Sequence, residues 1–171
     1  MQNSNVQEPI RIQKVIAQAG IASRRAAEKL ILSGVVMLNG EIVKEMGQKM
    51  IIGKDHLSVE GRRVKISQHK KTQVYALYKP KNCITTLNDP EGRTTISDFF
   101  PQTSVRLFPI GRLDYDAEGL ILLTNDGDLA QQLMHPSHKV WKGYFVKVRG
   151  FVKNETLAAL RRGPVIEKRK H

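Results

Sequence analysis

The sequence predicts an α+β fold in two parts. Residues 10–34 carry apolar side chains at helical spacing, interrupted by the glycine at position 20. Residues 35–66 form short alternating runs that are typical of small strands. From residue 74 onward, strand-like apolar runs interleave with helical patterns. We therefore expect a small N-terminal unit of two helices and short strands, followed by a mixed α+β domain.

The first two helices are predicted by periodicity and by their end signals. Four apolar residues recur on one helix face between residues 10 and 19, namely Ile12, Val15, Ile16 and Ala19. Gly20 should end this helix, and Ser23 should cap the N-terminus of a second helix that ends before Gly34. Because the connection is so short, the two helices should pack against each other.

Short strands and a linker should follow the helices. Asn39 and Gly40 supply the left-handed backbone of a tight turn between two strands, and the compact unit should end near Ile66. Residues 67–73 are polar and basic without periodicity, which is typical of a linker. The predicted division is therefore a disordered tail at 1–9, a first domain at 10–66, the linker at 67–73 and a second domain at 74–171.

The second domain should alternate strands and helices. The runs VYALYK, LILLT and WKGYFVKV predict three strands, the last over residues 141–148. A helix should begin near Asp128 and stop at Pro136, and NETLAALRRG predicts a final helix. We expect these helices to lie on one face of the sheet.

Charge and composition narrow the classes of function. The chain of 171 residues has a formal net charge of +12, and its pI is near 10.0, which favours a polyanionic partner such as nucleic acid. The sequence has no apolar run of about 20 residues and no signal-peptide pattern, so we expect a cytoplasmic protein with no membrane partner. The single cysteine, Cys83, excludes an internal disulfide and is expected to be buried.

Basic residues gather on the predicted helix pair. Lys14, Arg24, Arg25 and Lys29 can share one face, where cations could bind phosphates, although a solvated basic face is an equal alternative from charge alone. Together with Gly34, Val36 and the Asn39–Gly40 turn, this segment resembles the RNA-binding domain of the ribosomal protein S-four type. The resemblance implies RNA contacts from six residues of this sequence: Lys14, Ser23, Arg24, Arg25, Asn39 and Lys49.

Residues 109–136 concentrate acids within a basic protein, and Asp114 stands out among them. It follows an arginine-leucine pair and precedes the strand-like run LILLT. A calcium loop starting at Asp114 would require glutamate at its twelfth position, where Asn125 stands. His135 and His138 lack a third metal ligand at a suitable spacing, so we expect no metal. The remaining alternative is a turn capped by Asp114 and paired with Arg112.

The segment GRLDYDAEGLILLTNDGDLAQQLMHP resembles the signature of bacterial pseudouridine synthases of the ribosomal small-subunit pseudouridine synthase A type. Other landmarks of that family are the strand LYKP, the run TTLNDPEGRTT, and Lys142 with Tyr144. The resemblance implies that Asp114 is the catalytic carboxylate, that Arg112 braces the space left by an everted base, and that Tyr144 stacks on the uracil. It also implies that Lys142 contacts RNA and that no cofactor is used.

The chain departs from the family pattern in places. Asn82 stands where glycine is common, and Ala117 stands where a hydroxyl residue is usual. The family also continues beyond the last predicted helix, so 74–171 should be a partial catalytic domain. We expect an isomerase that converts a uridine of ribosomal RNA to pseudouridine and acts as a monomer. The alternative is a truncated, non-catalytic RNA-binding protein that keeps only the docking domain.

Overall fold

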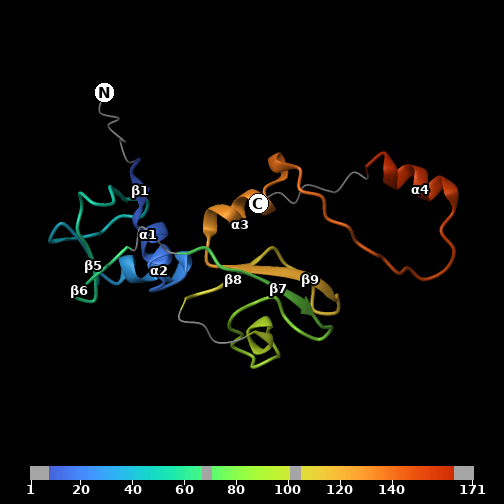
Figure 1. Cartoon of the computed structure of the whole chain (residues 1–171), viewed down its shortest axis with the longest axis horizontal. Helices are drawn as coiled ribbons and strands as arrows, with labels where there is room; N and C mark the ends of the chain where they lie inside the picture. Colours follow the sequence, from blue (N-terminus) through green and yellow to red (C-terminus); the bar gives the residue numbers. More distant parts are fainter. Residues whose placement is uncertain (1–7, 67–70, 101–104, 164–171) are drawn as a thin grey trace. The chain divides into compact units, whose positions relative to one another are not determined.

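The computed structural model describes residues 8–66, 71–100 and 105–163. It divides the chain into two units, Met1–Val140 and Trp141–His171. The first unit holds two separate hydrophobic cores, one beneath the N-terminal helices and one beneath the later sheet. The expected α+β class is confirmed (Figure 1).

The two predicted N-terminal helices are present and pack against each other. They are α1 (Ile12–Gln18) and α2 (Arg24–Leu32). The Ser23 hydroxyl accepts a hydrogen bond of 3.0 Å from the Ala26 amide, as an N-cap does. The first helix starts two residues later than expected because β1 (Ile10–Arg11) pairs with β4 (Lys49–Met50).

A small antiparallel sheet completes the N-terminal core. It contains β2 (Val36–Leu38), β3 (Glu41–Ile42), β5 (Leu57–Val59) and β6 (Arg62–Arg63), in the order β3-β2-β5-β6. The turn from β2 to β3 uses Asn39 at φ 53° and Gly40 at φ 92°, which confirms the predicted left-handed backbone. Apolar side chains from both helices and from the strands form one buried cluster.

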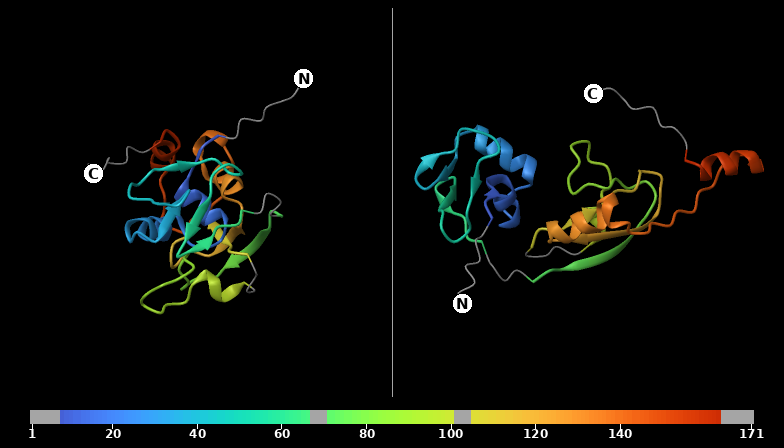
Figure 2. Two further views of the ribbon diagram at one scale, coloured as in Figure 1. Left: turned by 90° about the vertical axis from the view of Figure 1, so that its left-hand side faces the viewer. Right: turned by 90° about the horizontal axis from the view of Figure 1, so that it is seen from above.

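The later sheet has three strands in the order β7-β9-β8, all paired antiparallel. They are β7 (Val74–Lys79), β8 (Phe108–Ile110) and β9 (Gly119–Thr124). One face covers a core of Cys83, Ile96, Leu107 and Leu123, to which the 3-10 helix η1 (Ile96–Phe99) contributes. On the other face, Tyr78 and Leu120 lie opposite each other and are exposed. Figure 2 shows this sheet from two further sides.

Helix α3 (Gly127–Met134) follows β9 directly, and the short 3-10 helix η2 (Pro136–His138) comes next. The Asp126 carboxylate accepts hydrogen bonds of 3.0 Å from the Asp128 and Leu129 amides and so caps α3. The helix contacts β8, and it stops just before Pro136, as the sequence predicts. The cap and the proline together fix both ends of this helix.

In the second unit, α4 (Asn154–Arg161) confirms the predicted last helix. The strand expected over residues 141–148 is wrong for this structure. A strand requires a partner for its backbone groups, and no strand in the described part of the chain pairs with this segment. Its aromatic side chains are correspondingly bare, with Trp141 97% and Phe145 99% exposed.

No helix in the described part of the chain combines the length and apolar character that crossing a bilayer requires.

Candidate active site

Asp114 lies in the loop that joins β8 to β9, on a tight turn. The Ala117 amide donates a hydrogen bond of 3.2 Å to the Asp114 carbonyl oxygen, which closes the turn just before β9 begins at Gly119. The Asp114 side chain is exposed, whereas Leu113 before it is half-buried. The turn therefore holds the carboxylate at the surface, on a backbone that is anchored from both sides.

The Asp114 carboxylate has no interaction partner among the residues that the structure describes, so it is available to bind a ligand. Within residues 8–66, 71–100 and 105–163, it forms no hydrogen bond and no ion pair, and the same holds for the exposed Arg112 side chain. The alternative in which Asp114 pairs with Arg112 to cap a turn is therefore not the arrangement seen. The strand β9 also occupies the second half of the calcium loop considered above.

A buried lysine, Lys79, stabilises the turn that carries Asp114. Lys79 ends β7, and the alternation of that strand directs its side chain to the core face, where it is 0% exposed. Its ammonium group donates hydrogen bonds to three carbonyl oxygens: Ala117 at 2.7 Å, Pro80 at 3.0 Å and Tyr115 at 3.5 Å. A buried ammonium requires such partners, because burying it without them is costly. Lys79 thus ties the end of β7 to the turn that carries Asp114.

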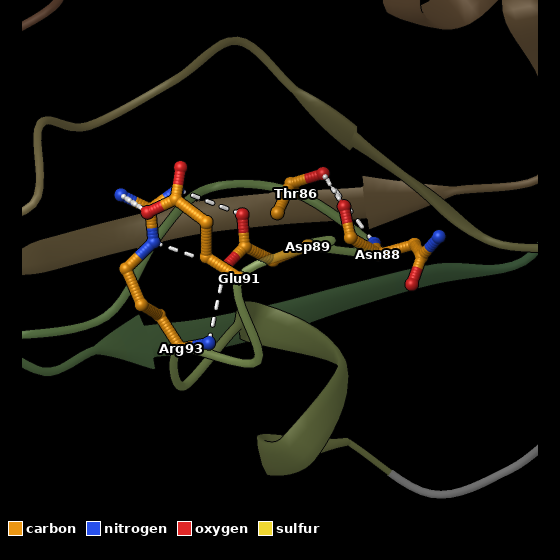
Figure 3. Close-up of polar contacts among 5 residues, drawn as sticks. All are labelled: Thr86, Asn88, Asp89, Glu91 and Arg93. Carbon is orange, nitrogen blue, oxygen red and sulfur yellow. Dashed lines mark hydrogen bonds and ion pairs between the residues drawn. The ribbon is translucent and has the colours of Figure 1, made fainter.

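A second loop, residues 86–93, is closed by an ion-pair cluster (Figure 3). The Arg93 guanidinium contacts both oxygens of the Asp89 carboxylate, at 2.9 and 2.8 Å, and lies 2.9 Å from a Glu91 oxygen. The pKa of Asp89 is lowered from 3.8 to about 2, chiefly by the hydrogen bonds from the Arg93 side chain. The bidentate geometry fixes the shape of this loop.

The structure brings three of the expected RNA-binding residues together. Lys14, Ser23 and Arg24 line one cavity of about 720 Å³. Further residues that line it are Arg106, Asn125, Gln131 and His135. The Lys14 ammonium lies 2.7 Å from an Asp128 oxygen, so one of the predicted RNA contacts already has an acidic partner. Arg25 and Lys49 are exposed.

Comparison with known proteins assigns a family to this fold and site. Residues 73–169 match the family described as RNA pseudouridylate synthase, and residues 10–50 match the S4 domain. The first match spans more than half of the chain. The chain belongs to the RNA pseudouridylate synthase family.

Relatives in this family are similar over nearly the whole chain. A Bacillus subtilis (strain 168) protein named ribosomal large subunit pseudouridine synthase B is 46% identical over 160 residues, which cover 94% of this chain and 64% of that protein. A protein of Aquifex aeolicus (strain VF5) named uncharacterized RNA pseudouridine synthase is 44% identical, with coverages of 92% and 63%. A crystal structure of pseudouridylate synthase is 33% identical at a TM-score of 0.41, covering 75% of this chain and 54% of that chain. The chain thus spans less than two thirds of the length of these relatives.

Asp114 and Arg112 both lie in the loop between β8 and β9. The other expected site residues lie in different surroundings. Asn39 uses its side-chain amide within the fold: it donates to Asp55 over 3.0 Å and accepts from the His56 amide over 2.8 Å. These bonds favour a role in shaping the turn over contact with RNA. Lys142 and Tyr144 belong to the second unit, where both side chains are exposed.

Sequence reasoning missed two contacts that support the candidate site in this member of the RNA pseudouridylate synthase family. LYKP was read only as a family landmark, although the alternation of VYALYK places Lys79 on the same face as Tyr75 and Leu77. That pattern could have shown an inward lysine in need of acceptors. The run TTLNDPEGRTT likewise spaces Asp89 and Arg93 four residues apart, but no strand or helix pattern indicated that they would meet.

Proposed function

We propose that this chain binds ribosomal RNA and isomerises a uridine in it to pseudouridine, with Asp114 as the catalytic carboxylate. The observation that carries the proposal is the exposed carboxylate of Asp114, which has no partner among the residues that the structure describes. It is held on an anchored turn inside the region that matches the RNA pseudouridylate synthase family. An ionised carboxylate without an internal partner is available to a substrate.

The proposed reaction breaks the bond between the ribose anomeric carbon and ring nitrogen N1, and it forms a bond from the same carbon to ring carbon C5. The C5 proton is lost and N1 gains a proton, so the atoms balance without an oxidant, a reductant or an external group. For this reason the proposal includes no cofactor. Asp114 would act either by attack on the anomeric carbon or by removal of the adjacent ribose proton.

The uridine must leave its stack to reach Asp114, which costs a few kcal/mol in structured RNA. We assign Arg112 to bracing the vacated space, because its exposed guanidinium is two residues from Asp114 and has no partner within the described residues. We assign Tyr144 to stacking on the everted uracil, a contact worth about 1 to 3 kcal/mol per base. Lys142, two residues before Tyr144, would contact the RNA backbone.

We further propose a division of labour along the chain. Residues 10–66 would dock the RNA through the cations of the helix pair, and residues 74–171 would supply the catalytic side chains. The match of residues 10–50 to the S4 domain and the exposure of Arg24 and Arg25 support the docking role. In this proposal the protein acts as a monomer in the cytoplasm, where ribosomal RNA is found.

For the substrate, we propose RNA of the large ribosomal subunit. The signature alone resembles the small-subunit type, but the relatives from Bacillus subtilis (strain 168) and Haemophilus influenzae, at 46% and 39% identity, are both named for the large subunit. These names favour the large-subunit RNA over the small-subunit RNA. An assay with each purified ribosomal RNA distinguishes the two.

A second candidate is an RNA-binding protein without turnover. The observation that favours it is the segment 141–148, which carries the proposed Tyr144 but forms no strand and leaves Trp141 97% exposed. If Tyr144 is not held in place, the docking domain would still bind RNA while the chemistry fails.

The deciding experiment measures conversion of uridine to pseudouridine in ribosomal RNA by this chain and by its Asp114→Asn variant. We expect conversion by the chain and a loss of at least a thousandfold in the variant, because the carboxylate is required in its charged form. Asp116→Asn is the matched control, since it changes a neighbouring exposed acid by the same atoms. RNA binding with no conversion by the unaltered chain would favour the second candidate.

A further inference from the structure

Beyond the last pair of the β7–β9 ladder, hydrogen bonds link the segment after β7 to the loop that carries Asp114. The ladder runs from Val74 opposite Thr124 to Lys79 opposite Gly119. The same register, carried past that last pair, sets Cys83 opposite Tyr115 and Thr85 opposite Leu113. Both pairs are hydrogen-bonded: the Cys83 amide donates to the Tyr115 carbonyl over 3.4 Å, and the Thr85 side chain bonds to Leu113.

Thr85 engages both backbone groups of the residue before Asp114. Its hydroxyl donates a hydrogen bond of 2.6 Å to the Leu113 carbonyl and accepts one of 3.2 Å from the Leu113 amide. Thr85 is buried, at 9% exposure. A single hydroxyl that serves as donor and acceptor to one residue holds the two peptide units that flank it, and so fixes the backbone of that residue more tightly than either bond alone.

Hydrogen bonds of the neighbouring residue Ile84 fix the backbone at Thr85. Ile84 next to it accepts a hydrogen bond of 3.1 Å from the Ile96 amide and donates one of 2.9 Å to the Thr94 carbonyl. The intervening loop is closed by the Asp89–Arg93 ion pair. The hydroxyl is therefore presented by a rigid segment, so a change at Thr85 should not be absorbed by movement of its own backbone.

We propose that Thr85 is a positioning residue for the catalytic carboxylate: through Leu113 it fixes the backbone from which Asp114 projects. This inference rests on the proposed function of Asp114. The Leu113 carbonyl carbon is bonded to the Asp114 nitrogen, so a turn of that peptide moves the carboxylate directly. Misplacement of a reacting group by about 1 Å can reduce a rate about a hundredfold.

The test compares Thr85→Val, which removes the hydroxyl, with Thr85→Ser, which keeps it. Thr124→Val is the matched control, because the Thr124 hydroxyl is also buried and also bonds two backbone groups, donating to the Gln73 carbonyl over 2.8 Å and accepting from the Asp126 amide over 3.1 Å. Thr124 lies at the far end of β9 from the Asp114 loop. Both valine variants should lose similar stability.

For Thr85→Val we expect kcat for pseudouridine formation to fall about ten- to a hundredfold while KM for RNA changes less than about threefold. Thr85→Ser should restore kcat to within about threefold of the unaltered chain. Thr124→Val should leave kcat unchanged. Equal losses of kcat in the two valine variants would reduce Thr85 to a structural role and overturn the inference.

A measurement that does not depend on turnover separates this inference from the proposed function. Hydrogen exchange at the Leu113 amide should be slow in the unaltered chain and in Thr85→Ser, and it should quicken at least tenfold in Thr85→Val, because the acceptor is lost. If the chain makes no pseudouridine but shows this exchange pattern, the proposed function fails while the Thr85 contact stands. Fast exchange of the Leu113 amide hydrogen in the unaltered chain would overturn the inference. This measurement does not depend on whether any variant folds.

Discussion

The Lys79 ammonium donates a hydrogen bond of 2.7 Å to the Ala117 carbonyl oxygen, although its side chain is 0% exposed. Its described partners are all carbonyl oxygens and include no carboxylate. This lysine therefore neutralises no acid. It binds the Tyr115 and Ala117 carbonyl oxygens of the candidate catalytic turn, together with that of Pro80, around one buried positive charge.

Replacement of Lys79 by Met should lower the free energy of unfolding by about 1 to 3 kcal/mol, because the carbonyl oxygens lose their donor in a buried place. Urea denaturation measures the change. Lys81→Met is the control: Lys81 is exposed and lies 3.7 Å from Glu118, an arrangement worth about 0 to 1 kcal/mol. Equal effects of the two substitutions would contradict the role given to Lys79.

Removal of the Arg93 guanidinium should change the acid titration of Asp89. In the folded chain the pKa of Asp89 is lowered to about 2, chiefly by the hydrogen bonds from Arg93. A lowered pKa in the fold contributes stability above the ordinary value of 3.8, and this stability is lost as the pH falls through about 2. In Arg93→Gln the Asp89 pKa should return toward its ordinary value.

An NMR titration of the Asp89 carboxyl carbon checks this shift. Glu91→Gln is the matched control, because it removes the other acidic partner of Arg93 and leaves the Asp89–Arg93 contacts in place. The Asp89 pKa should stay low in that variant. An Asp89 that titrates near 3.8 in the unaltered chain would refute the account of this loop.

Loss of the cap on α3 should destabilise that helix. Asp126→Ala removes the acceptor for two amides at the helix start, and substitutions of this kind cost about 0.5 to 2 kcal/mol. Asp126→Asn keeps an acceptor oxygen and should retain most of that stability. Thermal unfolding followed by circular dichroism distinguishes the two variants, and identical midpoints would count against the cap.

Removal of charge from α2 should weaken RNA binding and its dependence on salt. For the double variant Arg24→Ala with Arg25→Ala, we expect the slope of log affinity against log salt to become shallower by about one to two units, because fewer counterions are released. The control removes two charges from β6 instead, with Arg62→Ala and Arg63→Ala. A slope that responds equally to both double variants would mean that α2 is not the contact.

The ion pair between Lys14 and Asp128 predicts a gain of affinity. Asp128→Asn keeps the shape of the side chain and releases Lys14 from its acidic partner at 2.7 Å. RNA should then bind up to about fivefold more tightly at low salt, since an exposed pair of this kind is worth about 0.2 to 1 kcal/mol. The gain should shrink as salt rises. Weaker binding by Asp128→Asn would show that Lys14 does not reach RNA.

Sequence patterns predicted most of the elements because their signals are local. The cap at Ser23, the left-handed turn at Asn39 and the stop at Pro136 each depend on a few adjacent residues, and each is confirmed. The strand predicted at 141–148 failed for the opposite reason. Alternation specifies a strand's two faces but does not provide a neighbour for its backbone.

The candidate site shows the same difference between local signals and contacts made by distant segments. The position of Asp114 followed from its neighbours in the sequence, whereas its supports did not. Lys79 and Thr85 bond to residues 38 and 28 positions further along the chain, and the pairing of β7 with β9 brings these distant segments near each other. The register of two strands depends on all of their paired residues, so no single sequence motif predicts these contacts.

Trp141 is the one tryptophan of the chain, and it is 97% exposed. Neither hydrophobic core contains an indole, so the tryptophan fluorescence of the protein, excited selectively over tyrosine, reports on the 141–148 segment. A blue shift of the emission on addition of RNA would therefore signal the moment at which this segment is covered. The molecule carries its own probe beside Tyr144, and no label needs to be attached.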